Sequence, residues 1–197
     1  CQRDASRMSN LSIQEIHHYC INITQEIILI LGWRSISVDI LSAEDRSLLA
    51  AGVADSSLNW SWGMRHYYGG ISNGILDIHL KLTDRSTPGS LHAVILCKYD
   101  TRRNEFAICM LENFIAHEVS MLTGNILTIA LIYSTTFCDM LGLSEVFICD
   151  PVPDAQPRYR TYGFAQVANG YNKMSAEVID IKETIQRRIL NAQDIAY

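Results

Sequence analysis

The 197-residue sequence lacks closely spaced cysteines, long apolar runs and any excess of positive charge. Its cysteines form no CxxC pair and mostly lie within apolar stretches, which favours free thiols in a reducing compartment over a disulfide framework or a zinc site. The densest apolar run, residues 27–31, is far shorter than the roughly 18 to 20 residues of a membrane span. The N-terminal residues show no secretory signal pattern. We therefore expect a cytoplasmic protein with no membrane partner and no metal.

The chain also has fewer basic than acidic residues. The chain has 16 Lys and Arg against 21 Asp and Glu, which gives a net charge of -5. Nucleic-acid binding generally requires a positive field that displaces counterions, so the composition predicts no nucleic-acid partner. With 48% hydrophobic and 19% charged residues, the chain has the composition of a globular domain.

The N-terminal part predicts an amphipathic helix over residues 12–31. Ser12 and Glu15 form a capping box, apolar residues recur at three- and four-residue steps, and Gly32 ends the pattern. We treat residues 1–33 as an N-terminal extension and residues 34–197 as the main domain. The apolar face of the helix fits packing on the chain's own sheet, or on a second copy in a homodimer.

Alternating apolar residues predict a mixed central sheet that begins with an antiparallel meander. The polar turns DRSTPG and DTRRN separate its successive strands. An apolar helix between two later strands indicates a βαβ crossover. The fold class is α+β with α/β-like character. Strands are expected at 34–40, 74–82, 90–99, 105–115, 145–149, 164–168 and 177–181, and helices from Ser42 to about Val53, at 127–141 and at 182–192.

Residues 55–74 show no clear periodicity and are predicted to be irregular. The segment is rich in aromatic residues, which fit a substrate pocket for an apolar or cationic group. They fit a hydrophobic plug between the front helices and the sheet equally well. These aromatic residues are Trp60, Trp62, Tyr67 and Tyr68.

Gly124 stands between a strand and a helix. The first N–H groups of a helix have no partner within it and carry partial positive charge. A glycine at this bend lets a phosphate or pyrophosphate approach those groups closely. One glycine before a helix is also typical of an ordinary turn, so its meaning depends on the residues that follow.

Those residues resemble the GNAT superfamily of N-acetyltransferases. The segment 121–126 (MLTGNI) stands where the family has Q/R-x-x-G-x-G/A, ten residues after Ala116 at the strand end. An apolar helix, the strand EVFIC and the element from Tyr159 to Phe164 (YRTYGF) follow with the family's spacing and match its Y-x-x-x-G-F pattern. The resemblance covers about residues 34–168 and leaves the helix at 12–31 outside it.

The resemblance implies acyl transfer from acetyl-CoA, or another acyl-CoA, to a small-molecule, peptide or protein amine. It implies that Tyr159 is the general acid, with Glu112 as a candidate for the base. Pantetheine would bond to backbone near Glu112, and an N–H near Phe114 would stabilise the oxyanion. The implied cofactor-binding residues are Asn113, Phe114, Ile115, Ala116, Met121, Leu122, Thr123, Gly124, Asn125 and Ile126.

Three positions depart from the family pattern. Met121 replaces the usual Gln or Arg, Ile126 replaces Gly or Ala, and Val152 stands where many members have Asn. A β-branched side chain at Ile126 would crowd the place where the pyrophosphate approaches. These departures define an alternative, a catalytically degenerate GNAT-fold protein with a binding or regulatory role.

Overall fold

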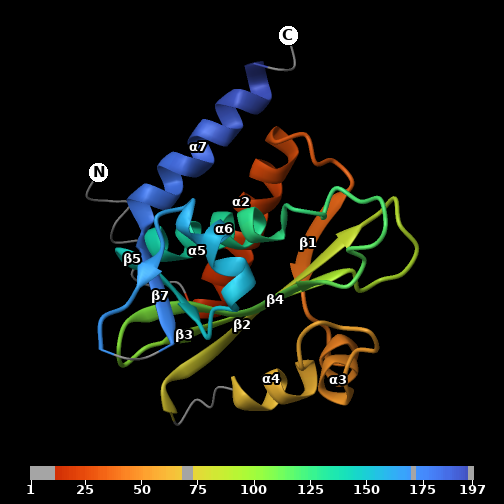
Figure 1. The fold of residues 1–197 in the computed structure, drawn as a ribbon, viewed down its shortest axis with the longest axis horizontal. Coiled ribbons are helices and arrows are strands. Elements are labelled where there is room, and N and C mark those ends of the chain that lie inside the picture. The colour runs from red at the N-terminus through yellow and green to blue at the C-terminus, as the bar shows by residue number, and fades with distance from the viewer. Residues whose placement is uncertain (1–11, 68–72, 170–171, 195–197) are drawn as a thin grey trace.

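The computed structural model describes residues 12–67, 73–169 and 172–194. One seven-stranded sheet in the order β1-β2-β3-β4-β5-β7-β6 runs through the molecule, with helices on both faces (Figure 1). The predicted antiparallel meander and crossover are confirmed, because β1 to β4 pair antiparallel and β5 pairs parallel to β4. The strands are β1 Ile36–Ile40, β2 Ile75–Asp84, β3 Ala93–Asp100, β4 Glu105–Asn113, β5 Glu145–Cys149, β6 Ala165–Gln166 and β7 Lys173–Glu177.

Three helices cover one face of the sheet: α2 Ile13–Ile30, α5 Ile126–Leu141 and α7 Val178–Asp194. The capping box of Ser12 and Glu15 starts α2, as predicted. Ile16, Cys20 and Ile28 of this helix belong to the same apolar core as the inward residues of β2, β3 and α5. The apolar face of α2 therefore packs on the chain's own sheet. The boundary at residue 33 stays a prediction.

The other face carries two short helices, α3 Ala43–Ala51 and α4 Trp60–His66. The expectation that residues 55–74 are irregular is therefore wrong for its central part. Asn59 caps α4 by accepting a hydrogen bond from the Trp62 N–H at 3.0 Å. Trp60, the first residue of the helix, is fully buried, and this burial compensates for a sequence with little helical periodicity.

The C-terminal part differs from the predicted pattern. The last strand is β7, which ends at Glu177, and the remaining residues of the strand predicted at 177–181 begin α7 instead. Val178, Ile181 and Ile185 lie at helical spacing and are all buried, so this apolar set forms one face of the helix. The short 3-10 turn η2 Pro153–Ala155 and the helix α6 Gln156–Arg160 connect β5 to β6.

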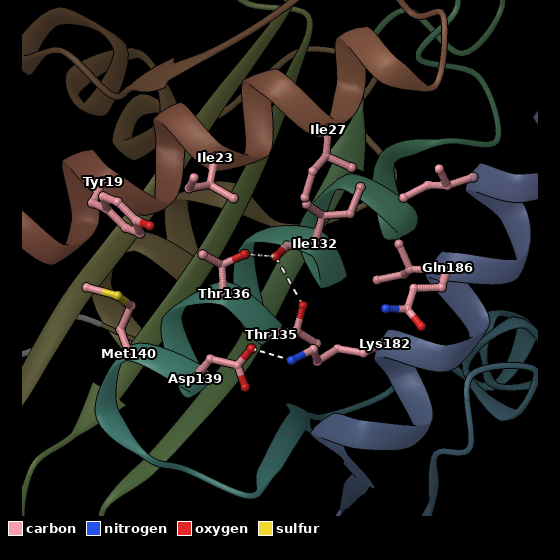
Figure 2. A pocket seen from close by; sticks show the side chains of 12 residues that line it. Tyr19, Ile23, Ile27, Ile132, Thr135, Thr136, Asp139, Met140, Lys182 and Gln186 are labelled. Carbon is pink, nitrogen blue, oxygen red and sulfur yellow. Dashed lines mark hydrogen bonds and ion pairs between the residues drawn. The ribbon is translucent and has the colours of Figure 1, made fainter. Parts of the chain in front are cut away.

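A hollow of about 450 Å³ lies among α2, α5 and α7. Figure 2 shows Ile23 and Ile27 of α2 facing it together with Ile132 of α5, and the ion pair of Lys182 with Asp139 at 2.6 Å on its rim. In the described part of the chain, none of the helices has the length and apolarity that a membrane span requires.

Candidate functional site

A splay between β4 and β5 opens the sheet at its centre. The two strands share three register pairs, from Phe106–Val146 to Ile108–Ile148, and then separate while β4 continues to Asn113. A bulge causes the separation. The β3–β4 register shifts between Leu96 and Cys97, which leaves Cys109 as an extra residue on β4. A bulge bends its strand and increases the local twist, so β4 turns away from β5 at this point.

A cavity of about 260 Å³ occupies the splay. Trp62 and Tyr67 line it from the helical side, Cys109 and Met110 from β4, and Tyr159 from α6. The cavity thus joins one predicted catalytic residue to two of the predicted substrate-binding aromatics. We refer to it below as the splay cavity.

The open edge of β4 offers main-chain groups to a ligand. The Phe114 N–H bonds to the His92 carbonyl at 2.8 Å, so this donor is not free for an oxyanion as the resemblance implies. Bonded and non-bonded pairs alternate in an antiparallel ladder. The main-chain N–H and C=O groups of Glu112 therefore also face β3, whereas those of Leu111 and Asn113 face the splay. Leu111 was not among the predicted residues.

The loop before α5 is held by one hydroxyl. Ser120 Oγ donates to Asp84 Oδ2 at 2.6 Å and accepts from the Leu122 N–H at 3.1 Å. Burial raises the pKa of Asp84, but the hydrogen bonds from Ser120 and Ser86 outweigh it, so the pKa lies well below its usual range. The loop is thereby fixed to the end of β2.

Gly124 adopts φ +79°, in the region that favours glycine. The N–H groups of Leu122, Thr123 and Asn125 are bonded within the loop, which removes them from the predicted donor set. Four N–H groups at the start of α5 have no hydrogen-bond acceptor among the described residues. They belong to Gly124, Ile126, Leu127 and Thr128.

Two arginines that the sequence did not single out border this helix start. Arg158 donates to the Gly124 carbonyl at 3.0 Å, and Arg188 donates to Thr128 Oγ1 at 2.9 Å. Both line a hollow of about 160 Å³ that Gly124 and Thr128 also border. Arg188 lies 60 residues from Thr128, so no sequence spacing could identify it, whereas Arg158 directly precedes the tyrosine of the YRTYGF element. This helix start thus combines two arginine side chains with N–H donors that have no acceptor among the described residues.

Tyr159 lies on α6 with 7% of its surface exposed. Its ring contacts Phe164 edge-on at 6.3 Å between centroids. Among the described residues, four other tyrosines are buried, and each has a hydrogen bond to its phenol: Tyr67, Tyr99, Tyr133 and Tyr162. The phenol of Tyr159 has no such partner in the described structure. Burial raises the pKa of Tyr159, which keeps the phenol protonated and able to donate.

Glu112 is already engaged. Its carboxylate accepts from the N–H groups of Ser57 at 2.7 Å and Leu58 at 3.0 Å, and from Trp60 Nε1 at 2.9 Å. These three donors fix the segment that leads into α4. A carboxylate so occupied is suited to positioning this segment beside the splay cavity, whereas its catalytic role stays a prediction.

The predicted substrate-binding aromatic residues differ in their surroundings. Trp60 is 1% exposed and packs edge-on against Phe114, so it forms part of the hydrophobic plug. Trp62 is 44% exposed and stacks on His66, and Tyr67 donates to Asp150 Oδ2 at 2.5 Å. Tyr68 lies outside the described residues.

The two departures at the glycine loop have different surroundings. Ile126 is 6% exposed and belongs to the core beneath α5, and it lines neither the splay cavity nor the hollow beside Gly124. Met121 is exposed, and its carbonyl accepts from Asn125 Nδ2 at 2.7 Å. Ala116 and Thr123 are exposed, whereas Ile115 and Leu122 are buried. Within the described residues, no group of three or more His, Cys, Asp or Glu could hold a metal ion.

The strand order, the splay beside a parallel pair and the glycine loop at a helix start together define the GNAT fold. No family model and no curated protein sequence matches the chain. Several solved structures match the chain. AtaTR bound with acetyl-CoA aligns at 14% identity over 76% of this chain and 97% of that one, with a TM-score of 0.54. The KacTA–DNA complex aligns at 10% identity over 77% and 99%, with a TM-score of 0.53.

An uncharacterized protein from Bacillus halodurans, bh2621, aligns at 10% identity over 80% of this chain and 91% of that one, with a TM-score of 0.54. At these identities the similarity concerns the fold alone. The resemblance to the GNAT superfamily is thus confirmed at the level of the fold.

One prediction is corrected by the same comparisons. KacTA is solved in complex with DNA, so a protein of this fold occurs in a nucleic-acid assembly. The exclusion of nucleic acid on the basis of net charge is therefore wrong. Screening limits the reach of exposed charges to about 8 Å at physiological salt, so local clusters decide such contacts and the sum over the chain does not.

Proposed function

We propose that this protein is an acyl-CoA-dependent N-acyltransferase that moves an acetyl group from acetyl-CoA to an amine. The observation that carries the proposal is Tyr159, which lines the splay cavity and whose phenol has no hydrogen-bond partner among the described residues. The preceding residue, Arg158, lines the cationic hollow at the start of α5. An acyl-CoA has two features that suit this arrangement, an anionic diphosphate and a thioester at the end of a narrow pantetheine arm.

The diphosphate binds at the start of α5 in this proposal. The N–H groups of Gly124, Ile126, Leu127 and Thr128 point their partial positive charge at it. Arg158 and Arg188 add full charges on the same side. The pantetheine arm follows the open edge of β4, where the main chain of Leu111 and Asn113 is available. The thioester then reaches the splay cavity.

The reaction requires stabilisation of the oxyanion and delivery of a proton to the CoA thiolate. A neutral amine attacks the thioester carbonyl, and an N–H on the open edge of β4 stabilises the oxyanion. The tetrahedral intermediate expels the CoA thiolate, which the Tyr159 phenol protonates. The amine's proton leaves to water. Trp62 and Tyr67 form the acceptor side of the cavity, and Glu112 positions the segment that carries them.

The binding half of the proposal is tested by thermal unfolding with acetyl-CoA. At a ligand concentration about 100 times the Kd, the protein should gain about 2.7 kcal/mol. Arg158→Ala should weaken binding roughly tenfold, because a charge-assisted contact to phosphate is lost. Arg160→Ala is the matched control, since Arg160 lies on the same helix and its side chain bonds only to Gln156 among the described residues.

Turnover separates the proposal from the degenerate alternative. Release of CoA thiol in the presence of a panel of amines supports the enzyme. Stabilisation by acetyl-CoA without thiol release for any amine supports a binding or regulatory protein of the same fold. If no acyl-CoA stabilises the protein, the acyltransferase proposal is refuted.

A further inference from the structure

Two cysteines meet where β4 and β5 begin to separate. Cys149 is the last residue of β5, and Cys109 is the bulge residue of β4, one step beyond the register pair Ile108–Ile148. Both side chains line the splay cavity together with Tyr159. Neighbouring strands lie about 4.8 Å apart, and disulfides join Cα atoms separated by about 4.4 to 6.8 Å. The two cysteines directly follow the last register pair, so the strand spacing that immediately precedes them lies within the range of a disulfide.

The two thiols also interact and differ in pKa. A hydrogen bond with Cys109, followed by the charges of Lys98 and Lys173, lowers the pKa of Cys149 to about 7, although burial acts in the opposite direction. The pKa of Cys109 is raised by the same hydrogen bond and by burial. Cys149 is partly exposed and also borders a second hollow with Lys98 and Lys173, which gives it access to solutes.

The remaining described cysteines have different surroundings. Cys20, Cys97 and Cys138 are buried and line none of the cavities described above. Burial raises the pKa of each of them, to about 12 for Cys20. Thiolates are the attacking species in disulfide exchange, so these three serve as internal controls.

We propose that Cys109 and Cys149 form a dithiol modification site that a low-molecular-weight disulfide of the glutathione type oxidises to an intramolecular disulfide. The Cys149 thiolate attacks one sulfur of glutathione disulfide and releases glutathione thiolate. Cys109 then loses its proton and attacks the Cys149 sulfur, which releases the second glutathione. Two protein thiols are oxidised, one glutathione disulfide is reduced to two thiols, and the two protons pass to those thiols.

The disulfide would tie β4 to β5 at the apex of the splay and place its sulfurs in the cavity that the thioester enters. Oxidation therefore blocks acyl-CoA binding and reduction restores it. This consequence rests on the proposed function, whereas formation of the disulfide depends only on the two thiols.

The test uses the full chain carrying Cys1→Ser, which removes the N-terminal thiol. The reduced, folded protein is incubated with glutathione disulfide, remaining thiols are alkylated, and intact mass and linked peptides are determined. The expected product has lost two hydrogen atoms and is linked between Cys109 and Cys149. Cys109→Ser should instead retain one glutathione on Cys149. Cys97→Ser and Cys138→Ser should give the same linkage as the unchanged protein.

A glutathione that stays on Cys149 although Cys109 is present, a linkage through another cysteine, or no reaction in the folded state would each overturn the site. Peptide mapping of the protein without further substitutions keeps the test decisive if a serine variant does not fold. Stabilisation by acetyl-CoA is then compared before oxidation, after oxidation and after dithiothreitol. Persistence of the stabilisation in the oxidised protein would refute the block. Its absence in the reduced protein would refute the proposed function and leave the linkage result standing.

Discussion

Tyr159 differs from the other buried tyrosines in the surroundings of its phenol. A buried phenol normally finds a hydrogen-bond partner, and the other buried tyrosines of the described chain have one. The Tyr159 phenol instead borders the splay cavity. This contrast identifies a donor that is available to a ligand.

We expect Tyr159→Phe to lower kcat by about 10²- to 10⁴-fold, because the thiolate then leaves without a proton from a positioned acid. The Kd for acetyl-CoA, measured by titration, should change little, since the ring and its packing remain. Tyr99→Phe is the control. Tyr99 is equally buried, but its phenol donates to Asn104 at 2.7 Å, away from the cavity. Equal rates for Tyr159→Phe and the unchanged protein would remove this phenol from the mechanism.

The helix α5 is bounded by two glycines with similar backbone geometry and different surroundings. Gly124 precedes its start with φ +79°, and Gly142 caps its end with φ +67°. A Cβ at Gly142 would meet nothing within 4 Å, and one at Gly124 would meet only Arg158 Nη2 at 4.0 Å. A comparison of alanine variants at the two glycines therefore distinguishes the effect of backbone strain from the effect of ligand contact.

Alanine at either glycine should lower the free energy of unfolding by about 1 to 2 kcal/mol, because a left-handed conformation is strained for L-residues. Only Gly124→Ala should also weaken acetyl-CoA binding, since its methyl group stands beside the unpaired N–H groups. Urea unfolding gives the first quantity and ligand titration the second. Equal affinity in the two variants would contradict the assignment of the diphosphate to the start of α5.

The tertiary contact between Ser120 and Asp84 makes the stability of the whole molecule depend on pH. The folded-state pKa of Asp84 is lowered, so its contribution is present above the unfolded value of about 3.9 and is lost as the pH falls through the folded value. We expect Asp84→Asn to cost about 1.5 to 3 kcal/mol at pH 7, and the difference from the unchanged protein to shrink below about pH 4.

Urea unfolding at a series of pH values measures this difference. Asp139→Asn is the control, because Asp139 pairs with Lys182 at the exposed rim of the α2–α5–α7 hollow. A surface pair of this kind contributes at most about 1 kcal/mol. A cost for Asp84→Asn that does not vary with pH would show that the carboxylate charge is not what stabilises the loop.

The sequence predicted most of the elements because their signals are local. The capping boxes of Ser12 and Ser42, the alternation in the meander and the apolar run of α5 each depend on residues a few positions apart. The segments that form α4 and the start of α7 were predicted wrongly, each for its own reason. The helix α4 forms over a buried tryptophan, and the start of α7 carries an apolar run that fits either period.

The sequence alone established an α+β chain with a glycine before its most apolar helix and a tyrosine at the GNAT spacing, since periodicity and spacing are properties of the chain itself. Only the tertiary structure decided which polar groups are already occupied. It bonded Glu112 to the segment before α4 and the Phe114 N–H to β3, and it left the Tyr159 phenol and the first N–H groups of α5 without a partner among the described residues. It also brought Arg188 beside Thr128 and Cys109 beside Cys149. A hydrogen bond or a charge pair depends on distance in space, and the fold alone sets that distance for residues far apart in the chain.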